Sequence, residues 1–253
     1  MKITFLGTGT SQGIPVIGCD CEVCKSTDFR NHRLRSSILI QTKTSSVVID
    51  TGPDFRQQML SNRVQSLDAV LFTHEHKDHV AGLDDIRSFN FKQKKDMPVY
   101  ASDRVIDRLK EEFPYIFQTE KYPGVPSLDI REIRNEPFEF NDLNFQPIEV
   151  LHYKLPIFGY RIRDFAYLTD VKTIDEKEKE KLQGLKVLVL NALQLKPHIS
   201  HLTLDEALEL IAELSPQKTY LTHISHYLGI HKEVEKNLPD NVFLAYDGLS
   251  IKV

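Results

Sequence analysis

The feature that most constrains this chain is a run of six residues rich in metal-ligating side chains, His74-Glu75-His76-Lys77-Asp78-His79. The run follows directly on the apolar segment 69–73, which predicts a buried strand. A loop at the carboxyl end of such a strand points into the crevice where α/β folds bind ligands. Because imidazole and carboxylate ligate zinc, manganese or iron, we expect His74 and His76 to hold one ion, with Asp78 and His79 turned toward a second.

Predicted strands recur along the chain with helices between them. Short apolar or β-branched runs predict strands at 2–7, 37–42, 46–50, 69–73, 145–151, 159–163, 165–169, 187–190, 218–222, 242–245 and 249–253. Spacing and capping signals predict helices at 54–60, 80–89, 175–182, 203–214 and 229–237. Strands with helices interspersed across both halves predict an α/β fold of two sheets between helix layers, and we expect one domain over residues 1–253.

The middle segment 112–149 has few helix signals and predicts a strand pair with a long loop. Its aromatic residues Tyr115, Phe117 and Tyr122 either line the site or pack in the core. Loop aromatics more often cover a core than bind a ligand, which favours packing.

Three further residues of ligand type each follow a predicted strand. His152 follows 145–151, Asp170 follows 165–169, and His223 follows 218–222. Each alone is a weak signal, because a polar residue at a strand end is often a solvated or capping residue. If the strand ends meet at one edge, these residues complete two coordination shells with the histidine run.

A second cluster holds all three cysteines, Cys19, Cys21 and Cys24, within six residues. An odd number in so tight a cluster is a poor disulfide framework and a good fragment of a metal site. Structural zinc takes four ligands, so one must come from elsewhere in the chain. His226, three residues after His223, is our first choice, and the alternatives are His231 and His32.

Composition excludes some classes of function. The 253 residues carry 32 basic and 36 acidic side chains, a net charge of −4, so non-specific nucleic-acid binding is not expected. No apolar run approaches a membrane span or a signal-peptide core, and a cytoplasmic location is the default expectation. A homodimer is the default for such enzymes.

The histidine run, followed by a single His, an Asp and a last His after successive strands, resembles the metallo-β-lactamase superfamily. The motifs match from Gly7-Thr8-Gly9 through Asp50-Thr51-Gly52 to the last histidine. The resemblance implies an αββα four-layer sandwich. It also implies that one ion is bound by His74, His76 and His152, the second by Asp78, His79 and His223, and that Asp170 bridges them. An aspartate at this last position resembles the hydrolases and phosphodiesterases of the superfamily rather than its cysteine-containing β-lactamases.

The Cys-x-Cys-x-x-Cys pattern is similar to that of phosphoribosyl cyclic phosphate phosphodiesterases of phosphonate breakdown, which group with tRNase Z. It also occurs in a protein of pyrroloquinoline quinone biosynthesis. The resemblance implies one structural zinc, with the second histidine of Thr222-His223-Ile224-Ser225-His226 as fourth ligand.

The expected chemistry is hydrolysis of a phosphodiester by a hydroxide that bridges two divalent ions, zinc or manganese. A poor leaving group needs a general acid, and His201 is the candidate because His201-Leu202-Thr203 resembles the His-x-Thr element of tRNase Z. We count Asp78 with it as a catalytic candidate. His198 nearby is expected to be a solvated histidine.

We therefore expect a binuclear phosphodiesterase acting on a small cyclic or nucleotide-like phosphodiester. The first alternative is a tRNase Z-like RNA endonuclease, although the chain shows no long Gly/Pro-rich arm for gripping tRNA. The second is a cofactor-biosynthesis protein with the same fold, which would not need His201 as an acid.

Overall fold

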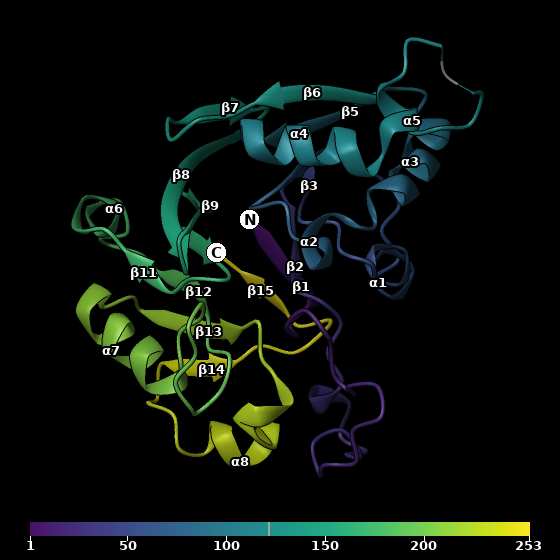
Figure 1. The fold of residues 1–253 in the computed structure, drawn as a ribbon. Coiled ribbons are helices and arrows are strands. Elements are labelled where there is room, and N and C mark those ends of the chain that lie inside the picture. Colours follow the sequence, from purple (N-terminus) through teal and green to yellow (C-terminus); the bar gives the residue numbers. More distant parts are fainter. Residues whose placement is uncertain (121) are drawn as a thin grey trace.

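The computed structural model describes residues 1–120 and 122–253, and two sheets form its centre (Figure 1). Parallel pairing joins β3 to β4, β5 and β6, while β1 and β2 pair antiparallel. The first sheet has the order β15 (Ser250–Lys252), β1 (Lys2–Gly7), β2 (Ser37–Gln41), β3 (Ser46–Ile49), β4 (Ala69–Leu71), β5 (Met97–Ala101) and β6 (Leu128–Glu132).

The second sheet is also mixed, with β10, β12, β13 and β14 parallel to one another. A short strand, β7 (Phe138–Phe140), pairs with its strand β8. The order is β11 (Thr173–Ile174), β8 (Leu143–His152), β9 (Leu155–Ile162), β10 (Phe165–Leu168), β12 (Val187–Asn191), β13 (Lys218–Thr222) and β14 (Val242–Leu244).

Helices cover the outer faces of the two sheets (Figure 1). The α-helices are α1 (Phe55–Ser61), α2 (Lys77–Val80), α3 (Arg87–Gln93), α4 (Asp103–Glu112), α5 (Pro114–Phe117), α6 (Glu176–Glu180), α7 (Leu204–Leu214) and α8 (His231–Glu235). The 3-10 helices are η1 (Phe29–Asn31), η2 (Leu83–Ile86) and η3 (His226–Leu228).

The alternation of side chains along each strand divides the core of the two sheets into three clusters, and a small fourth cluster lies in the N-terminal loop. Val47 and Ile49 of β3 face the second sheet, whereas Val48 packs on the helix layer of α1 and α3. Along β12, Val189 joins the cluster between the sheets and Leu188 packs toward α7. Two sheets with a helix layer on each outer side form an αββα sandwich, which confirms the predicted fold class.

The helix predicted over 80–89 is interrupted, and the prediction is wrong there. The chain forms α2, then η2, then α3, with a break at Gly82. A Cβ at Gly82 would lie 2.2 Å from the carbonyl oxygen of Gly52, and the Gly82 N–H donates to Thr51 O at 2.7 Å. This close approach of two backbones prevents a continuous helix.

The middle segment differs from its prediction. The helices α4 and α5 occupy its first part and the preceding residues, and three strands, β6, β7 and β8, follow. Ser102 caps α4, with its hydroxyl accepting from the Val105 N–H. Thr203 caps α7 with both bonds of a capping box, as its sequence predicts.

Candidate metal centre

The predicted ligands lie at or just after the carboxyl ends of four strands. His74 follows β4, His152 ends β8, Asp170 follows β10, and His223 follows β13. Asp170 and His223 have φ values of 59° and 53°, so the backbone turns sharply after each strand. The structure brings all seven predicted ligands into two neighbouring groups.

The first group is His74, His76 and His152, each offering a ring nitrogen within 4.8 Å of the others. His74 Nε2 lies 3.0 Å from His76 Nδ1. The other nitrogens are engaged: His74 Nδ1–H donates to Thr73 Oγ1 at 3.0 Å and His152 Nδ1–H to the Ser200 carbonyl at 2.9 Å. These bonds leave Nε2 of His74 and His152 with a free lone pair.

The second group is Asp78, His79, Asp170 and His223. His79 Nε2 lies 3.2 Å from Asp78 Oδ2 and 3.3 Å from Asp170 Oδ2, and His223 Nε2 lies 3.2 Å from Asp170 Oδ1. Two ligands of one zinc ion at tetrahedral angles are about 3.3 Å apart. The spacing therefore fits a shared cation.

A buried nitrogen supports the same conclusion. His79 Nε2 is buried and makes no hydrogen bond to any residue among 1–120 and 122–253. Its Nδ1–H donates to Asp50 Oδ2 at 2.7 Å, which directs the other nitrogen at the two carboxylates. A buried polar atom without a partner is costly, and a cation between His79 and those carboxylates would satisfy it.

Asp50 is a functional residue that the sequence analysis did not single out as a side chain. It lies directly after β3, is fully buried, and has a φ of 65°. Its carboxylate also accepts from the Thr73 N–H and the Thr73 hydroxyl, both at 2.9 Å. The sequence signal that could have identified Asp50 is its position at the end of a predicted strand, within Asp50-Thr51-Gly52.

The electrostatics suit cation binding. Burial lowers the pKa of His74 well below its usual range and the pKa of His223 to about 4. Burial raises the pKa of Asp170, but His223 and His79 outweigh burial and hold that pKa well below its usual range. Neutral imidazoles beside charged carboxylates are the protonation states that a metal site needs.

His79 is the exception in this group. Burial lowers its pKa, but the carboxylates of Asp78, Asp170 and Asp50 outweigh burial and hold the pKa well above its usual range. Three carboxylates around one imidazole therefore demand positive charge at this point.

His201 lies beside the two ligand groups. Its Nε2 is 3.1 Å from Asp170 Oδ1, and it forms a third possible ligand group with His152 and Asp170. Its Nδ1 is 3.1 Å from His198 Nδ1 and 3.0 Å from Ser200 Oγ. His198, expected to be a solvated histidine, instead contacts His201.

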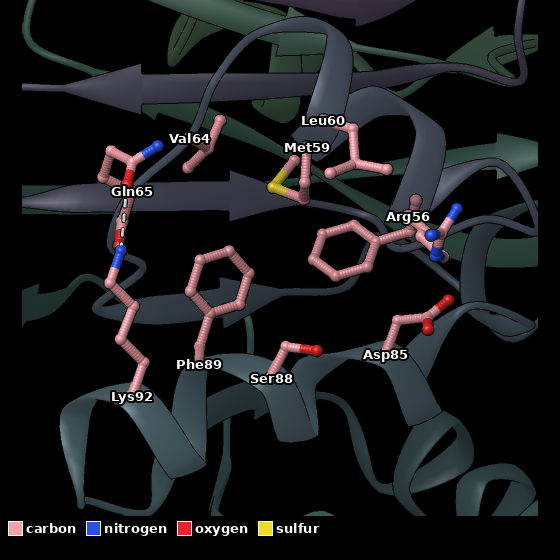
Figure 2. A pocket seen from close by; sticks show the side chains of 10 residues that line it. Arg56, Met59, Leu60, Val64, Gln65, Asp85, Ser88, Phe89 and Lys92 are labelled. Atoms are coloured by element: carbon pink, nitrogen blue, oxygen red, sulfur yellow. Dashed lines mark hydrogen bonds between the residues drawn. The ribbon is translucent and has the colours of Figure 1, made fainter.

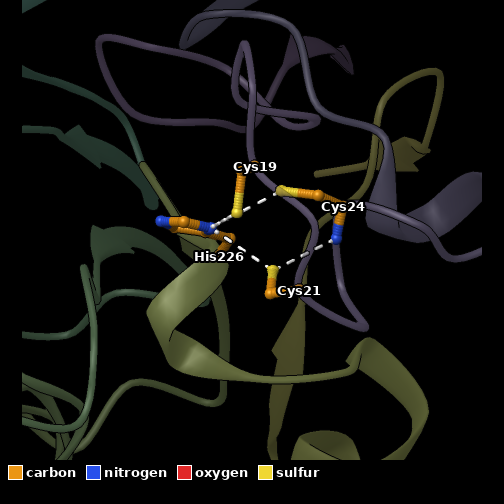
Figure 3. Close-up of side chains that lie close together, drawn as sticks. All are labelled: Cys19, Cys21, Cys24 and His226. Carbon is orange, nitrogen blue, oxygen red and sulfur yellow. Dashed lines mark hydrogen bonds between the residues drawn. The ribbon is translucent and has the colours of Figure 1, made fainter.

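The cysteine cluster closes around His226 (Figure 3). Its Nδ1 lies 3.2 Å from Cys19 Sγ and 3.5 Å from the sulfur atoms of Cys21 and Cys24. Hydrogen bonding from the Cys24 N–H lowers the pKa of Cys21 to about 6, which favours the thiolate that binds metal. Burial raises the pKa of Cys24 to about 11.

The two alternative candidates for the fourth ligand, His231 and His32, contact other residues instead of the cysteines. His231 is fully buried and accepts from the Arg33 guanidinium at 3.0 Å, while His32 bonds the Ser26 carbonyl at 2.8 Å. The structure thus places His226, our first choice, among the cysteines. Three thiolates and an imidazole fit tetrahedral zinc.

Several other residues lie apart from the ligand groups. Tyr115 and Phe117 pack against the helix-layer core, and Tyr122 is 80% exposed. Glu75 and Lys77, which neighbour the ligands, pair with Arg104 and Glu112 of α4. A hollow between α1 and α3 (Figure 2) shares no lining residue with the ligand groups.

A model of the β-lactamase superfamily domain matches residues 45–224, a span that runs from before the histidine run to just beyond His223. The chain belongs to the β-lactamase superfamily. The resemblance to this superfamily predicted from the sequence is confirmed.

Individual relatives extend this result. The octanoyltransferase of Porphyromonas gingivalis is 41% identical over 252 residues, which cover 98% of this chain and 51% of that protein. The crystal structure of a new diphosphatase from the PhnP family has a TM-score of 0.93 at 40% identity, covering 100% of this chain and 97% of that one. Zinc-bound PqqB from Methylobacterium extorquens has a TM-score of 0.81 at 19% identity, covering 100% of both chains, a likeness of fold.

This chain spans about half the length of the curated relatives it matches, so the name of the octanoyltransferase belongs to a protein about twice as long. Within the described residues, no helix is long and apolar enough to cross a membrane.

Proposed function

We propose that the chain is a binuclear metal-dependent phosphodiesterase for a small cyclic or nucleotide-like phosphodiester. The observation that carries this proposal is the position of Asp170. Its carboxylate lies within 3.3 Å of His79, His223 and His201, and it shares a ligand group with His152. One carboxylate thus joins both candidate cation sites to a candidate acid, and the likeness to a diphosphatase supports phosphoryl chemistry.

Two divalent cations held there, zinc or manganese, would supply Lewis acidity toward the phosphoryl oxygens and a nucleophilic water at neutral pH. In hydrolysis the water oxygen bonds to phosphorus, the bond from phosphorus to the leaving oxygen breaks, and the leaving oxygen takes a proton. His201 would donate that proton from Nε2, which points at Asp170. Asp78 would help to hold the second cation.

We further propose that Cys19, Cys21, Cys24 and His226 bind a structural zinc ion. His226 lies three residues from His223 on the same segment. The next residue after His223, Ile224, donates from its N–H to Thr8 O at 2.9 Å. A zinc at the cysteines would therefore brace the segment that carries a catalytic ligand.

The test is hydrolysis of bis(p-nitrophenyl) phosphate by metal-free protein refilled with zinc or manganese. Asp170→Ala is expected to abolish turnover and reduce bound metal, while the zinc of the cysteine cluster stays. Asp164→Ala, which removes an exposed carboxylate paired with Lys186, is the matched control. No turnover with either metal in folded protein that retains its structural zinc would contradict the proposal.

The acid role of His201 predicts dependence on the leaving group. His201→Ala should lower kcat about 100-fold or more for a nucleoside alkoxide leaving group, which needs a proton. The loss should be about 10-fold or less for p-nitrophenolate, which departs without one. Equal losses for both substrates would contradict the role, and His32→Ala, at an exposed histidine, serves as control.

A further inference from the structure

Two hollows flank the ligand groups and share His76 and Arg104 in their walls. The first has a volume of about 460 Å³ and the second about 540 Å³, each within the range of small-molecule sites. A substrate with its phosphorus at the cations therefore has room for a group on each side. A small cyclic phosphate would fill only part of this space.

The two hollows differ in chemistry. Besides the shared residues, the walls of the first are charged with both signs, from Glu75 and Lys77 and from Asp107, Arg108 and Glu111 of α4. The second, which we call the stacking hollow, is lined by Tyr153, Lys154, Leu155, Ile199 and the ligand His152. It offers one aromatic ring, two aliphatic side chains and one ammonium group.

The apolar side chains of the stacking hollow face solvent. Tyr153 is 48% exposed and Ile199 is 67% exposed. Lys154 Nζ lies 5.4 Å from the centroid of the Tyr153 ring, and within the described residues no carboxylate is within 4.0 Å of it. An aromatic face and an uncommitted positive charge therefore adjoin in one hollow.

The backbone supplies an independent observation. Tyr153 is the first residue of the two-residue turn between β8 and β9, in which His152 pairs with Leu155. Its φ of 58° lies in the left-handed region, which favours Gly, Asn or Asp in such turns. This turn places the Tyr153 ring next to the ligand His152.

The two walls of the stacking hollow are also tied to each other. His152 Nδ1–H donates to the carbonyl of Ser200, the residue after Ile199. This bond sets the Tyr153 turn and the Ile199 segment at a fixed separation across the mouth. An aromatic ring and an aliphatic side chain in one hollow suit a flat ring.

We propose that the stacking hollow binds the base of a nucleoside phosphodiester that carries a second, non-scissile phosphate, as a diphosphate diester does, with the base against Tyr153 and Ile199 and the non-scissile phosphate on Lys154. This proposal rests on the proposed function, because the scissile phosphate is placed at the cations. Stacking on an aromatic side chain tolerates any base, and a lysine ammonium binds phosphate as a point charge. An acyl chain would use the apolar walls but leave Lys154 without a partner.

Binding of products tests the subsite without requiring turnover. Calorimetry on the metal-loaded protein compares adenosine monophosphate with ribose 5-phosphate, which has the same sugar and phosphate but no base. We expect the nucleotide to bind about 10-fold more tightly. Tyr153→Ala should remove most of this difference and Tyr153→Phe should keep it, while Tyr122→Ala, at an exposed tyrosine outside the hollow, should leave it unchanged.

The lysine has its own test. Adenosine diphosphate should gain affinity over the monophosphate in the native protein, and Lys154→Ala should remove that gain. Equal affinity for nucleotide and ribose 5-phosphate, or a base preference that survives Tyr153→Ala, would overturn the proposal. If bis(p-nitrophenyl) phosphate is hydrolysed in that case, only the subsite fails. Base-dependent binding without any hydrolysis would contradict the proposed function instead.

Discussion

At the residue scale, Asp50 orients ligand residues without facing the candidate cation sites. It accepts from His79 Nδ1–H and from Thr73, whose hydroxyl in turn accepts from His74. One buried carboxylate thus fixes the ring orientation of a histidine in each ligand group. Such partners of metal-binding histidines typically change metal affinity 10- to 100-fold when removed.

We therefore expect Asp50→Asn to weaken binding of at least one catalytic cation about 10- to 100-fold. The asparagine keeps the size of the side chain but loses the charge that orders His79. Competition with a chromogenic chelator measures the change. Asp142→Asn is the matched control, since Asp142 also accepts from two hydroxyls but lies at the surface beside Ser45 and Thr42. Native affinity in Asp50→Asn would contradict this role.

At the element scale, the strands were the part of the fold that the sequence predicts best. Apolar and β-branched runs such as 46–50 and 187–190 form strands because both faces are covered, by a second sheet and by helices. The prediction of a continuous helix over 80–89 was wrong because the break depends on the contact of Gly82 with Gly52, and these two residues are distant in sequence. The strand β5 and the helix α4 were not predicted at all.

The turn between β8 and β9 carries a stability prediction. The left-handed backbone conformation of Tyr153 costs free energy, whereas glycine adopts that conformation without strain. Tyr153→Gly should therefore be about 1 kcal/mol more stable than Tyr153→Ala, a difference of about 2–4 °C in Tm. Both variants lose the same ring, so calorimetry of the pair isolates the backbone. An alanine variant that melts at or above the glycine variant would show that the turn is unstrained.

At the scale of the whole molecule, the sequence predicts the candidate metal ligands. It does not predict the residues that orient those ligands or that line the neighbouring hollow. Residue type and strand-end position identify His152, Asp170 and His223, because cations need particular donor atoms wherever the chain supplies them. The roles of Asp50 and Tyr153 depend on contacts between segments that are distant in sequence, Asp50 with Thr73 and His79, and Tyr153 with Ile199 in one hollow. Local spacing carries no signal for such contacts.

A buried network of hydrogen bonds joins the N-terminal loop to the last part of the chain. The Arg33 guanidinium donates to Thr8 Oγ1, to the Ala245 carbonyl and to His231 Nδ1. Asp247 accepts from the Thr8 hydroxyl at 2.8 Å and from the Leu34 N–H at 2.6 Å. The loop that carries the three cysteines is thereby fixed to the segments that follow β13.

Two residues of this network, His231 and Asp247, are expected to change the free energy of unfolding in opposite directions as pH changes. Burial and Arg33 lower the pKa of His231 to about 4, so its contribution to stability is present above the unfolded value and is lost as pH falls. Burial raises the pKa of Asp247 to about 6, so its contribution is present at low pH and is lost as pH rises through 6. Between pH 4 and pH 6, the contribution of His231 to the free energy of unfolding rises with pH, whereas the contribution of Asp247 falls.

His231→Asn should separate them. The amide oxygen of asparagine can accept from Arg33 in place of Nδ1 but does not titrate. Relative to the native protein, the variant should gain about 2 kcal/mol of unfolding free energy when pH falls from 7 to 5, because it no longer takes up a proton on unfolding. Urea unfolding of both metal-loaded proteins at the two pH values measures the change, and packing losses cancel since they are the same at each pH. A difference that is equal at pH 5 and pH 7 would mean that His231 already carries a proton in the folded protein, and the opposed pair would not exist.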